Sequence, residues 1–297
     1  MLAGLRHQVG LDLPPLEEGR AGDPGLFGPG SEVWHIGRER ILLLGGPAAL
    51  LLQLAHPLVA AGVAEHSGFP ADPFDRLRAT LDATLRISFG DGEQVEEAAS
   101  RVAATHHKVQ GTLPAAAGPF RAGSPYAASD PALAMWVFAT LVSVALDVYR
   151  RFVGPLSWSR CGRYYQEARR FARLFGVTDE ILPATYGGFR QYVGRMEQGE
   201  LLVVSDDARN MARDVLGPPL PALLRLSRPA ANAVTAWLLP LKVRRGFGLR
   251  WGPAERAVAG AVRTSVRATI RGWPPSLRYW EHYRAACRRV GMAPYGE

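Results

Sequence analysis

The stretch from residue 41 to residue 64 contains no charged side chain, and it constrains the fold more than any other part of the chain. Its length is enough to cross a lipid bilayer as one helix. It is interrupted, however, by four residues that break or kink helices, Gly45, Gly46, Pro47 and Pro57. It also holds Gln53 and His56, which need partners when buried. We therefore predict two buried helical segments at the centre of a soluble protein rather than a membrane span.

The rest of the chain is dominated by helical periodicity, and the alternation of apolar and polar residues that indicates strands is almost absent. The pattern predicts an all-α protein with helices at 35–46, 47–65, 75–89, 93–111, 131–152, 159–176, 179–199, 206–216, 253–271 and 275–290. Asp130, followed by Pro131, is the expected N-cap of the helix at 131–152. Ser159 is expected to cap the helix that follows it.

Three regions are expected along the 297 residues. Residues 1–33 are rich in Gly and Pro and are expected to form a loose leader. Residues 34–216 are expected to form one large helical domain, because the loops between the predicted helices are short. Three prolines then interrupt the chain, Pro218, Pro219 and Pro221. Residues 217–297 are expected to form a helical extension that packs on this core.

The net charge of +8 and the sequence pI near 9.9 are also seen in nucleic-acid-binding proteins. Only Lys108 and Lys242 among the 35 basic residues are lysines, however, and this bias is typical of a GC-rich genome. The arginines are scattered, and their densest clusters are short and match no binding motif. We therefore predict no nucleic-acid partner.

The two cysteines, Cys161 and Cys287, are far apart and form no C-x-x-C pair. This spacing favours neither a zinc cluster nor a disulfide framework, and two reduced thiols are typical of a cytoplasmic protein. The N-terminal region is acidic and lacks the basic start and apolar run of a secretion signal. A cytoplasmic location is therefore expected.

His106 stands where the helix predicted at 93–111 should carry an apolar residue. Positions on one helical face recur in steps of 4, 3, 4 and 3, at Val95, Ala99, Val102, His106 and Val109. His107 is rotated by about 100° from that face. An imidazole that points inward needs a partner for each ring nitrogen. A metal ion is one candidate, and a backbone carbonyl group is the other.

Short motifs follow one another in order from about residue 33 to residue 216. They are Gln53-Leu-Ala-His56-Pro57, Glu65-His66-Ser67, Asp72-Pro73-Phe74-Asp75-Arg76-Leu77, Thr80, Phe89-Gly90, His106-His-Lys-Val109-Gln-Gly111, Tyr126-Ala127, Asp130-Pro131, Trp136-Val137 and Phe152-Val153-Gly154-Pro155-Leu156. The series resembles the catalytic-domain family of the rubber oxygenases (latex-clearing proteins) and of the fungal mycophenolic-acid-pathway oxygenase. Residues after about 220 carry little of this resemblance.

The resemblance implies a helical core similar to that of a globin, with a bound heme b. The His-x-x-Val-x-Gly pattern then assigns the iron ligand to His106 and not to His107. It also implies that Arg76 and Thr80, which are four residues apart and share a helix face, lie beside the heme pocket. There Arg76 would pair with a heme propionate or order a carboxylate near the iron, and Thr80 would offer a hydroxyl. Ala79 departs from the family, whose latex-clearing protein has a distal lysine here, and this argues against the same resting iron and substrate.

Glu65 and His66 are the candidates for acid–base work on the distal side, where they would stabilise polarised O₂ or remove an allylic proton. The alternative for both is a structural role at a helix end. Arg76 has the alternative of an ordinary surface arginine, and Thr80 that of a core residue. His56, which precedes a proline, is expected to be a core residue that bonds backbone groups freed by the kink.

The resemblance thus implies a heme b-dependent oxygenase that uses O₂ to cleave a carbon–carbon double bond in a hydrophobic, isoprenoid- or lipid-like substrate. Two alternatives stay open: a non-enzymatic heme-binding or gas-sensing protein, and a heme-free helical protein that binds lipid or a membrane surface. Peripheral membrane contact is predicted at 230–251, where an apolar segment precedes a basic cluster flanked by Trp237 and Trp251. The alternative for this segment is a helix that packs back on the core.

Overall fold

The charge-free stretch is helical, as predicted, but the single helix predicted at 47–65 is divided into two helices that meet at a sharp bend. The structure is a computed structural model that describes residues 13–66, 73–218 and 225–293. In it, α3 (Gly46–Leu54) and α4 (Pro57–His66) are separated at Ala55 and His56. The segment Arg40–Leu54 and α4 are bent by 107° relative to each other. Pro57 lacks the amide hydrogen with which α3 would continue, so the helix ends there.

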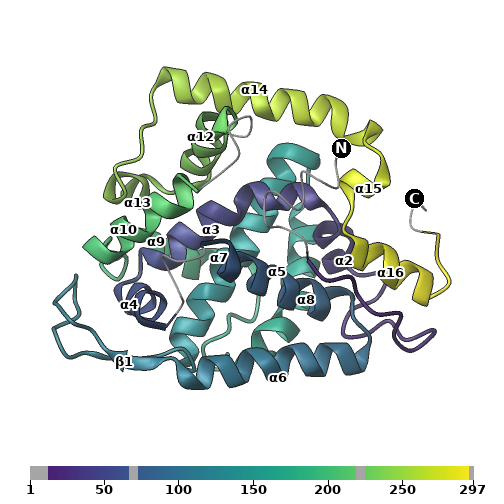
Figure 1. Cartoon of the computed structure of the whole chain (residues 1–297), viewed down its shortest axis with the longest axis horizontal. Coiled ribbons are helices and arrows are strands. Elements are labelled where there is room, and N and C mark those ends of the chain that lie inside the picture. Colours follow the sequence, from purple (N-terminus) through teal and green to yellow (C-terminus); the bar gives the residue numbers. More distant parts are fainter. Residues whose placement is uncertain (1–12, 67–72, 219–224, 294–297) are drawn as a thin grey trace.

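Helices make up most of the described structure and confirm the predicted all-α class (Figure 1). They include α2 (Glu32–Gly37), the 3₁₀ helix η1 (Arg40–Gly45) and α10 (Asp206–Leu216). Within the described ranges, the named strands are β1 (Gln110–Thr112) and β2 (Pro125–Ala127). They pair antiparallel, with Gly111 opposite Tyr126.

The apolar helix α7 (Pro131–Val148) lies at the centre of the molecule and packs against α3. Trp136 donates its indole N–H to the Leu52 carbonyl oxygen at 3.1 Å, and Gln53 donates to the Thr140 hydroxyl at 3.0 Å. By length and composition alone, the segment Pro131–Val153 would be able to span a membrane, and so would the bent pair if it is counted as one span. However, 67% of the tested part of Pro131–Val153 is buried inside the protein, as in a core helix.

The N-terminal caps confirm one prediction and correct two others. Asp130 caps α7 by accepting from the Ala132 amide at 2.7 Å, as expected. The cap of α8 (Trp158–Leu174) is Ser157, not Ser159, because the Ser157 hydroxyl accepts from the Arg160 amide. Helix α9 (Tyr186–Gln198) begins seven residues later than predicted, because Thr185 caps it and Pro183 precedes the cap.

Helices α5 (Pro73–Phe89) and α6 (Gly92–Lys108) form an antiparallel hairpin. Asp91 and Gln94 make a capping box at the start of α6, in which each side chain accepts from the other residue's backbone amide. Helix α6 ends at Lys108 and not at Gly111 as predicted, because the next residues leave the helix and pair in β1. The helix predicted at 35–46 also differs from the structure, which has α2 followed by the 3₁₀ helix η1 in this part of the chain.

The C-terminal residues return to the N-terminal part of the chain. In α16 (Glu281–Arg289), Tyr283 packs its ring 6.0 Å from that of Trp34 and 5.7 Å from that of Phe89. Arg278 in α15 (Pro275–Arg278) lies 2.8 Å from the fully buried carboxylate of Glu39. Residues 13–31 contain no helix or strand, but they bury two apolar side chains, Leu16 and Phe27, and are not loose.

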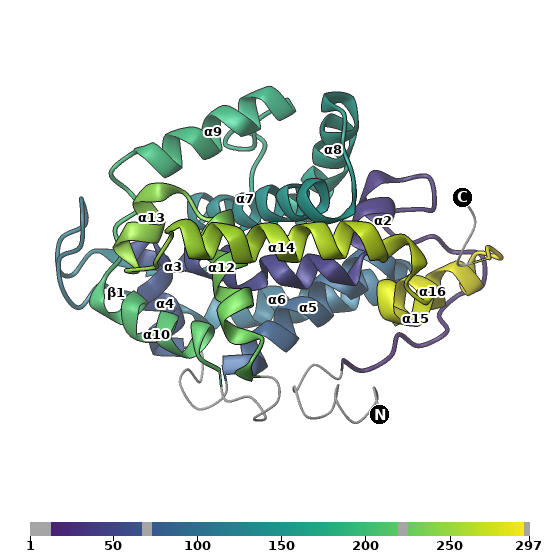
Figure 2. The same cartoon turned by 90° about the horizontal axis from the view of Figure 1, so that it is seen from above.

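Helices α12 (Arg228–Leu238), α13 (Leu241–Gly246) and α14 (Pro253–Thr269) cover one side of the molecule (Figures 1 and 2). Helix α14 lies along the outside, against α12 and the π-helical turn η2 (Tyr149–Val153), and is followed by the short η3 (Ile270–Gly272). The apolar face of α12 points inward and is buried at Val234, Ala236 and Leu238. The segment at 230–241 therefore packs back on the core, which was the alternative for it.

Candidate functional site

Three chain segments bring the predicted site residues to one end of the helical bundle. Helix α4 ends with Glu65 and His66, α5 begins shortly afterwards, and His106 lies in the last turn of α6. Because α5 and α6 are antiparallel and joined by a tight turn, the first turns of α5 are level with the last turns of α6. An ion pair of 4.0 Å between Asp82 and Arg101 fixes this register. The backbone positions of Arg76 and Thr80 are thus level with the part of α6 that contains His106.

Glu65 is held by a buried tyrosine. The Tyr126 hydroxyl donates a hydrogen bond to Oε2 of Glu65. Tyr126 is only 5% exposed, and its burial, with the hydrogen bond to Glu65, raises the pKa of the phenol far above its usual value. The hydroxyl therefore stays protonated and remains a donor. The two residues are 61 positions apart, so no local spacing could indicate the contact. In the sequence, Tyr126 is recognisable only as a motif residue, without a role.

The β1–β2 ribbon is the surface on which the end of α4 rests. A Cβ atom at Gly111 would lie 2.6 Å from the Tyr126 hydroxyl and 3.0 Å from the Glu65 carboxylate, so only glycine fits beside this pair. His66 donates from Nε2 to the Gln110 carbonyl oxygen at 3.1 Å. Glu65 and His66 are both exposed, and they attach the end of α4 to the strand that follows α6. The structure thus gives both residues a structural contact in addition to the predicted role.

His106 is half-buried, like Val102 and Val109 on the same face. Helix α6 buries Gln94, Val95 and Ala98 near its start, and burial decreases toward its end. The imidazole of His106 lies 6.2 Å from the ring of Phe175, which follows α8. His107 is exposed, so the predicted difference between the two histidines is confirmed.

The predicted site residues of α5 are Arg76 and Thr80, and only the side chain of Thr80 is described. Thr80 is exposed, and so is Ala79 beside it, so Thr80 is not the core residue that was its alternative. The Thr80 carbonyl oxygen accepts from the Thr84 hydroxyl at 2.7 Å. The side chain of Arg76 lies outside the described residues, and its predicted role stays a prediction.

His56 is a buried core histidine, as expected, but within the described part of the chain its ring makes no hydrogen bond to the backbone. It lies at the bend between α3 and α4 with 4% of its surface exposed. Among the described residues, its buried Nδ1 atom has no hydrogen-bond partner, and its ring lies 5.3 Å from that of Phe120. Burial lowers the pKa of His56 to about 4, so the imidazole is neutral near pH 7.

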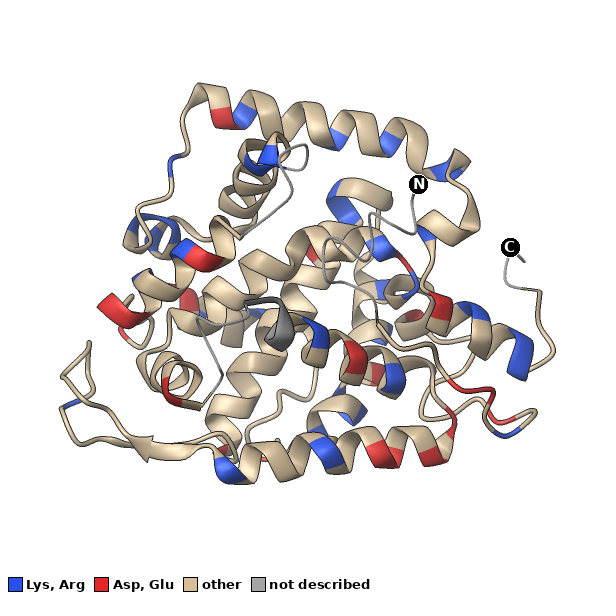
Figure 3. Ribbon diagram, viewed as in Figure 1, with Lys and Arg blue, Asp and Glu red and all other residues tan. Residues whose placement is uncertain are grey.

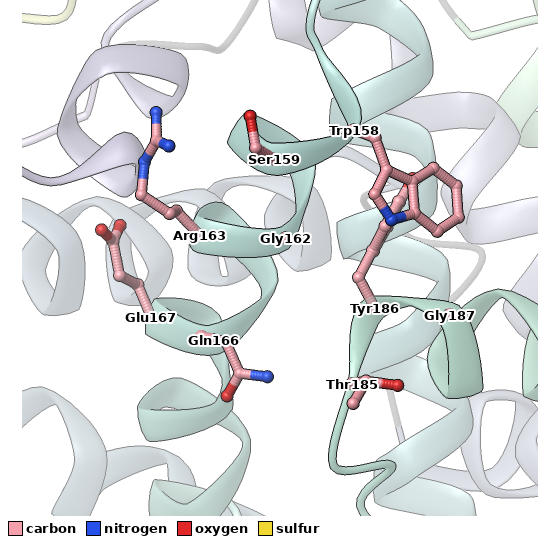
Figure 4. A pocket seen from close by; sticks show the side chains of 9 residues that line it. All are labelled: Trp158, Ser159, Gly162, Arg163, Gln166, Glu167, Thr185, Tyr186 and Gly187. Atoms are coloured by element: carbon pink, nitrogen blue, oxygen red, sulfur yellow. The ribbon is translucent and has the colours of Figure 1, made fainter.

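A cavity of about 660 Å³ opens between α8 and the start of α9, away from all of the predicted residues (Figure 4). Trp158, which is 65% exposed, and Tyr186 line one side with their rings 4.7 Å apart. Polar side chains on the other side have structural partners: Arg163 pairs with Glu32 at 2.7 Å, and Gln166 donates to the Ala184 carbonyl oxygen. The cavity therefore offers an aromatic wall but no group arranged for acid–base chemistry.

Comparisons with known proteins define the class and then the family. The fold is similar to that in the structure of latex clearing protein LCP in the closed state, with a TM-score of 0.55, 20% sequence identity, and coverage of 85% of this chain and 70% of that chain. Two uncharacterized proteins, one from Mycobacterium bovis and one from Mycobacterium tuberculosis, are each 30% identical over 223 residues, which is 71% of this chain and 82% of the relative. The class of fold is thus the all-α fold of latex clearing protein.

Residues 33–271 match the family described as ER-bound oxygenase mpaB/B'/Rubber oxygenase, catalytic domain. The chain belongs to this family, which confirms the resemblance. The match extends beyond residue 216 and includes α12, α13 and α14, which sequence analysis assigned to a C-terminal extension.

The surroundings of His106 are chemically suited to the heme that the resemblance implies. A single imidazole is a common axial ligand of heme iron, and the porphyrin needs apolar neighbours. His106 is half-buried, and Phe175 beside it packs 4.8 Å from Phe171. Val102 and Val109, one turn before and one turn after it, are also half-buried. The residues present therefore fit an axial ligand beside an apolar wall.

Proposed function

We propose that the protein is a heme b-dependent oxygenase that cleaves a carbon–carbon double bond in a hydrophobic unsaturated substrate, and that it acts in the cytoplasm. Membership of an oxygenase family supports the reaction class. The observation that carries the proposal is that the Glu65–Tyr126 pair and His106 lie at the same end of the helical bundle. The Glu65–Tyr126 pair rests on β1, and β1 follows directly on the turn of α6 that presents His106.

In this proposal His106 holds the heme iron, and Arg76 pairs with a heme propionate from the facing turn of α5. Bound heme would supply the binding and activation of O₂. The protein supplies the apolar wall formed by Phe171 and Phe175, which favours a hydrophobic substrate and excludes water. Thr80, which is exposed, would offer its hydroxyl toward the same opening.

Glu65 is the proposed base. Tyr126 engages one carboxylate oxygen, Oε2, and thereby fixes the orientation of the carboxylate. The second oxygen, Oε1, has no hydrogen-bond partner among the described residues and would accept an allylic proton from the substrate. His66 is proposed to assist, although its bond to the Gln110 carbonyl oxygen already gives it a structural role.

The proposed partners are O₂ and an isoprenoid- or lipid-like molecule. Such substrates concentrate in membranes, and a peripheral membrane contact involving residues 230–251 is part of the proposal. Because the apolar face of α12 is buried, the contact would rest on side chains beyond α12 and not on that face.

The visible spectrum of the protein, expressed with an adequate heme supply, tests the cofactor and its ligand together. We expect a Soret band that is lost in His106→Ala and retained in His107→Ala. The two variants are a matched pair, since both remove one imidazole from the last turn of α6. A colourless wild-type protein, or equal loss of the band in both variants, would contradict the proposal and favour the heme-free alternative.

Turnover separates an oxygenase from a heme-binding or gas-sensing protein. Glu65→Gln should retain the Soret band and lose oxygen consumption with an unsaturated lipid such as squalene. Wild-type protein that holds heme but consumes no oxygen with a panel of isoprenoids would favour the non-enzymatic alternative.

A further inference from the structure

The excess of positive charge lies in one part of the chain, although single basic residues are scattered along its whole length. Residues 225–271 contain ten Lys and Arg side chains and one acidic side chain, Glu255. Because the whole chain has a net charge of +8, the remaining residues are close to neutral. This segment forms α12, α13 and α14, which cover one side of the molecule (Figure 3). A strong field of one sign therefore arises on this side.

The arginines of α14 form a stripe without counter-charges. Arg256, Arg263 and Arg267 are spaced by seven and four residues, which places them on one face of the helix. Arg256 and Arg263 are exposed, and Arg267 is half-buried. Within the described part of the chain, no ion pair involves these three residues or Arg245 in α13. Most exposed arginines of α8 and α10, by contrast, pair with a nearby carboxylate, as Arg173 does with Asp179.

Arg244 has buried hydrogen-bond donors without an acceptor among the described residues. Its guanidinium lies 5.1 Å from the centroid of the Trp251 ring, and Nη2 donates to the Leu239 carbonyl oxygen. Nε and Nη1 are buried and have no acceptor among the described residues. Burial, followed by the charges of Arg256 and Arg245, lowers the pKa of Arg244. A buried guanidinium with two unsatisfied nitrogens is costly, and a nearby anion would offset that cost.

We propose that the arginines of α13 and α14 form a docking surface for the phosphate groups of an anionic membrane. Arg245 and Arg256 are exposed and would contact the lipid phosphates, while Arg244 adds charge from beneath them. Apolar contact favours a membrane over a soluble anion or a nucleic acid. Leu241 is 54% exposed on the first turn of α13, three and four residues before Arg244 and Arg245 and hence on their side of the helix.

This surface deepens the proposed membrane contact and replaces insertion of an apolar helix by electrostatic adsorption. Each basic residue near an anionic surface contributes roughly fivefold to membrane partitioning, and the effect is screened by salt. The cytoplasmic leaflet carries the negative surface potential that such a stripe requires. The inference rests on the proposed membrane contact and does not depend on heme, so a colourless protein that binds vesicles would overturn only the proposed oxygenase.

Sedimentation of the full-length protein with lipid vesicles tests the surface. We expect binding to phosphatidylcholine vesicles that contain one third phosphatidylglycerol, little binding to pure phosphatidylcholine, and loss of binding near 1 M NaCl. The double variant Arg245→Gln/Arg256→Gln should bind about 25-fold more weakly. Arg190→Gln/Arg195→Gln is the matched control, because it removes two exposed charges from α9 and should bind like the wild type.

Further measurements distinguish binding to a membrane from binding to soluble anions and from an effect of net charge alone. Equal weakening in both double variants would overturn the proposal, because it would show an effect of net charge alone. So would binding of glycerol 3-phosphate or of a fluorescent oligonucleotide, lost in Arg245→Gln/Arg256→Gln, without binding to the anionic vesicles. Arg244→Leu removes a guanidinium group whose buried Nε and Nη1 have no acceptor among the described residues. This variant should melt at or above the wild-type temperature and should bind vesicles more weakly. Vesicle binding by this variant at wild-type strength would show that Arg244 has no part in the surface.

Discussion

Removal of the Tyr126 hydroxyl should uncouple Glu65 from the β1–β2 ribbon. The bond is charge-assisted, and such bonds contribute about 1.5–3 kcal/mol. Tyr126 is buried but Glu65 is exposed, so we expect the lower end of this range, a loss of about 1.5 kcal/mol in the free energy of unfolding for Tyr126→Phe. The substitution removes one hydroxyl group from β2 and leaves His106 in place on α6, so the heme spectrum should stay intact. Oxygen consumption should fall about tenfold, since Glu65 loses its fixed orientation.

A double-mutant cycle is the decisive assay. Urea unfolding of Tyr126→Phe, Glu65→Gln and the combined variant should give a coupling free energy of about 1 kcal/mol or more. Tyr165→Phe is the control: its hydroxyl donates to the Pro183 carbonyl oxygen at 2.6 Å, so its loss should cost a similar amount but show no coupling to Glu65. Additivity of Tyr126→Phe and Glu65→Gln within about 0.3 kcal/mol would refute the reasoning.

Three further predictions concern stability. Gly111→Ala should destabilise the protein by about 1–3 kcal/mol in urea unfolding, because the new Cβ would displace the tyrosine–glutamate pair, whereas Gly162→Ala, with nothing within 4 Å, should be neutral or stabilising. Burial lowers the pKa of His56 to about 4, so unfolding protonates it below pH 6.5; His56 alone should remove about 2–3 kcal/mol of stability between pH 6.5 and pH 4, and His56→Leu should reduce the pH dependence by that share without abolishing it, because two other histidines have a pKa lowered to about 4. Arg278→Leu should cost about 3 kcal/mol, because the buried carboxylate of Glu39 would keep only its 3.9 Å ion pair with Arg38, and adding Glu39→Gln should restore part of the loss; no recovery in the double variant would contradict the pairing.

Local signals predicted the helical architecture well. Asp130 and Pro131 mark the start of α7 because capping depends only on neighbouring residues, and Pro57 was recognised as a helix breaker because proline in a helix interior removes a backbone hydrogen bond. Gly111, by contrast, was interpreted as a helix stop, although the ribbon needs it for close approach to Tyr126. Both interpretations require a glycine, and only the partner strand distinguishes them.

The candidate site was predicted as a set of residues but not as an arrangement. Helical phase distinguished His106 from His107, since the phase is fixed within one helix. It does not predict how deeply His106 is buried, because burial depends on how many elements cover the end of α6. The contact between Glu65 and Tyr126 joins residues 61 apart, and no local spacing indicates it. Local spacing does place the three arginines of α14 on one face, but only the structure shows that no carboxylate pairs with them among the described residues.

The joint between α6 and β1 is the single residue Val109, because α6 ends at Lys108 and β1 begins at Gln110. This short connection limits how relatives of this chain can vary in length. The connection that follows β1 begins at Leu113 and returns at Ser124, so residues added to that tip would leave both paired strands in place. One residue inserted at Val109 would have a different effect. It would either turn the imidazole by about 100° or shift every side chain of β1 to the opposite side of the ribbon. Insertions and deletions should therefore accumulate at the tip and be absent from the joint.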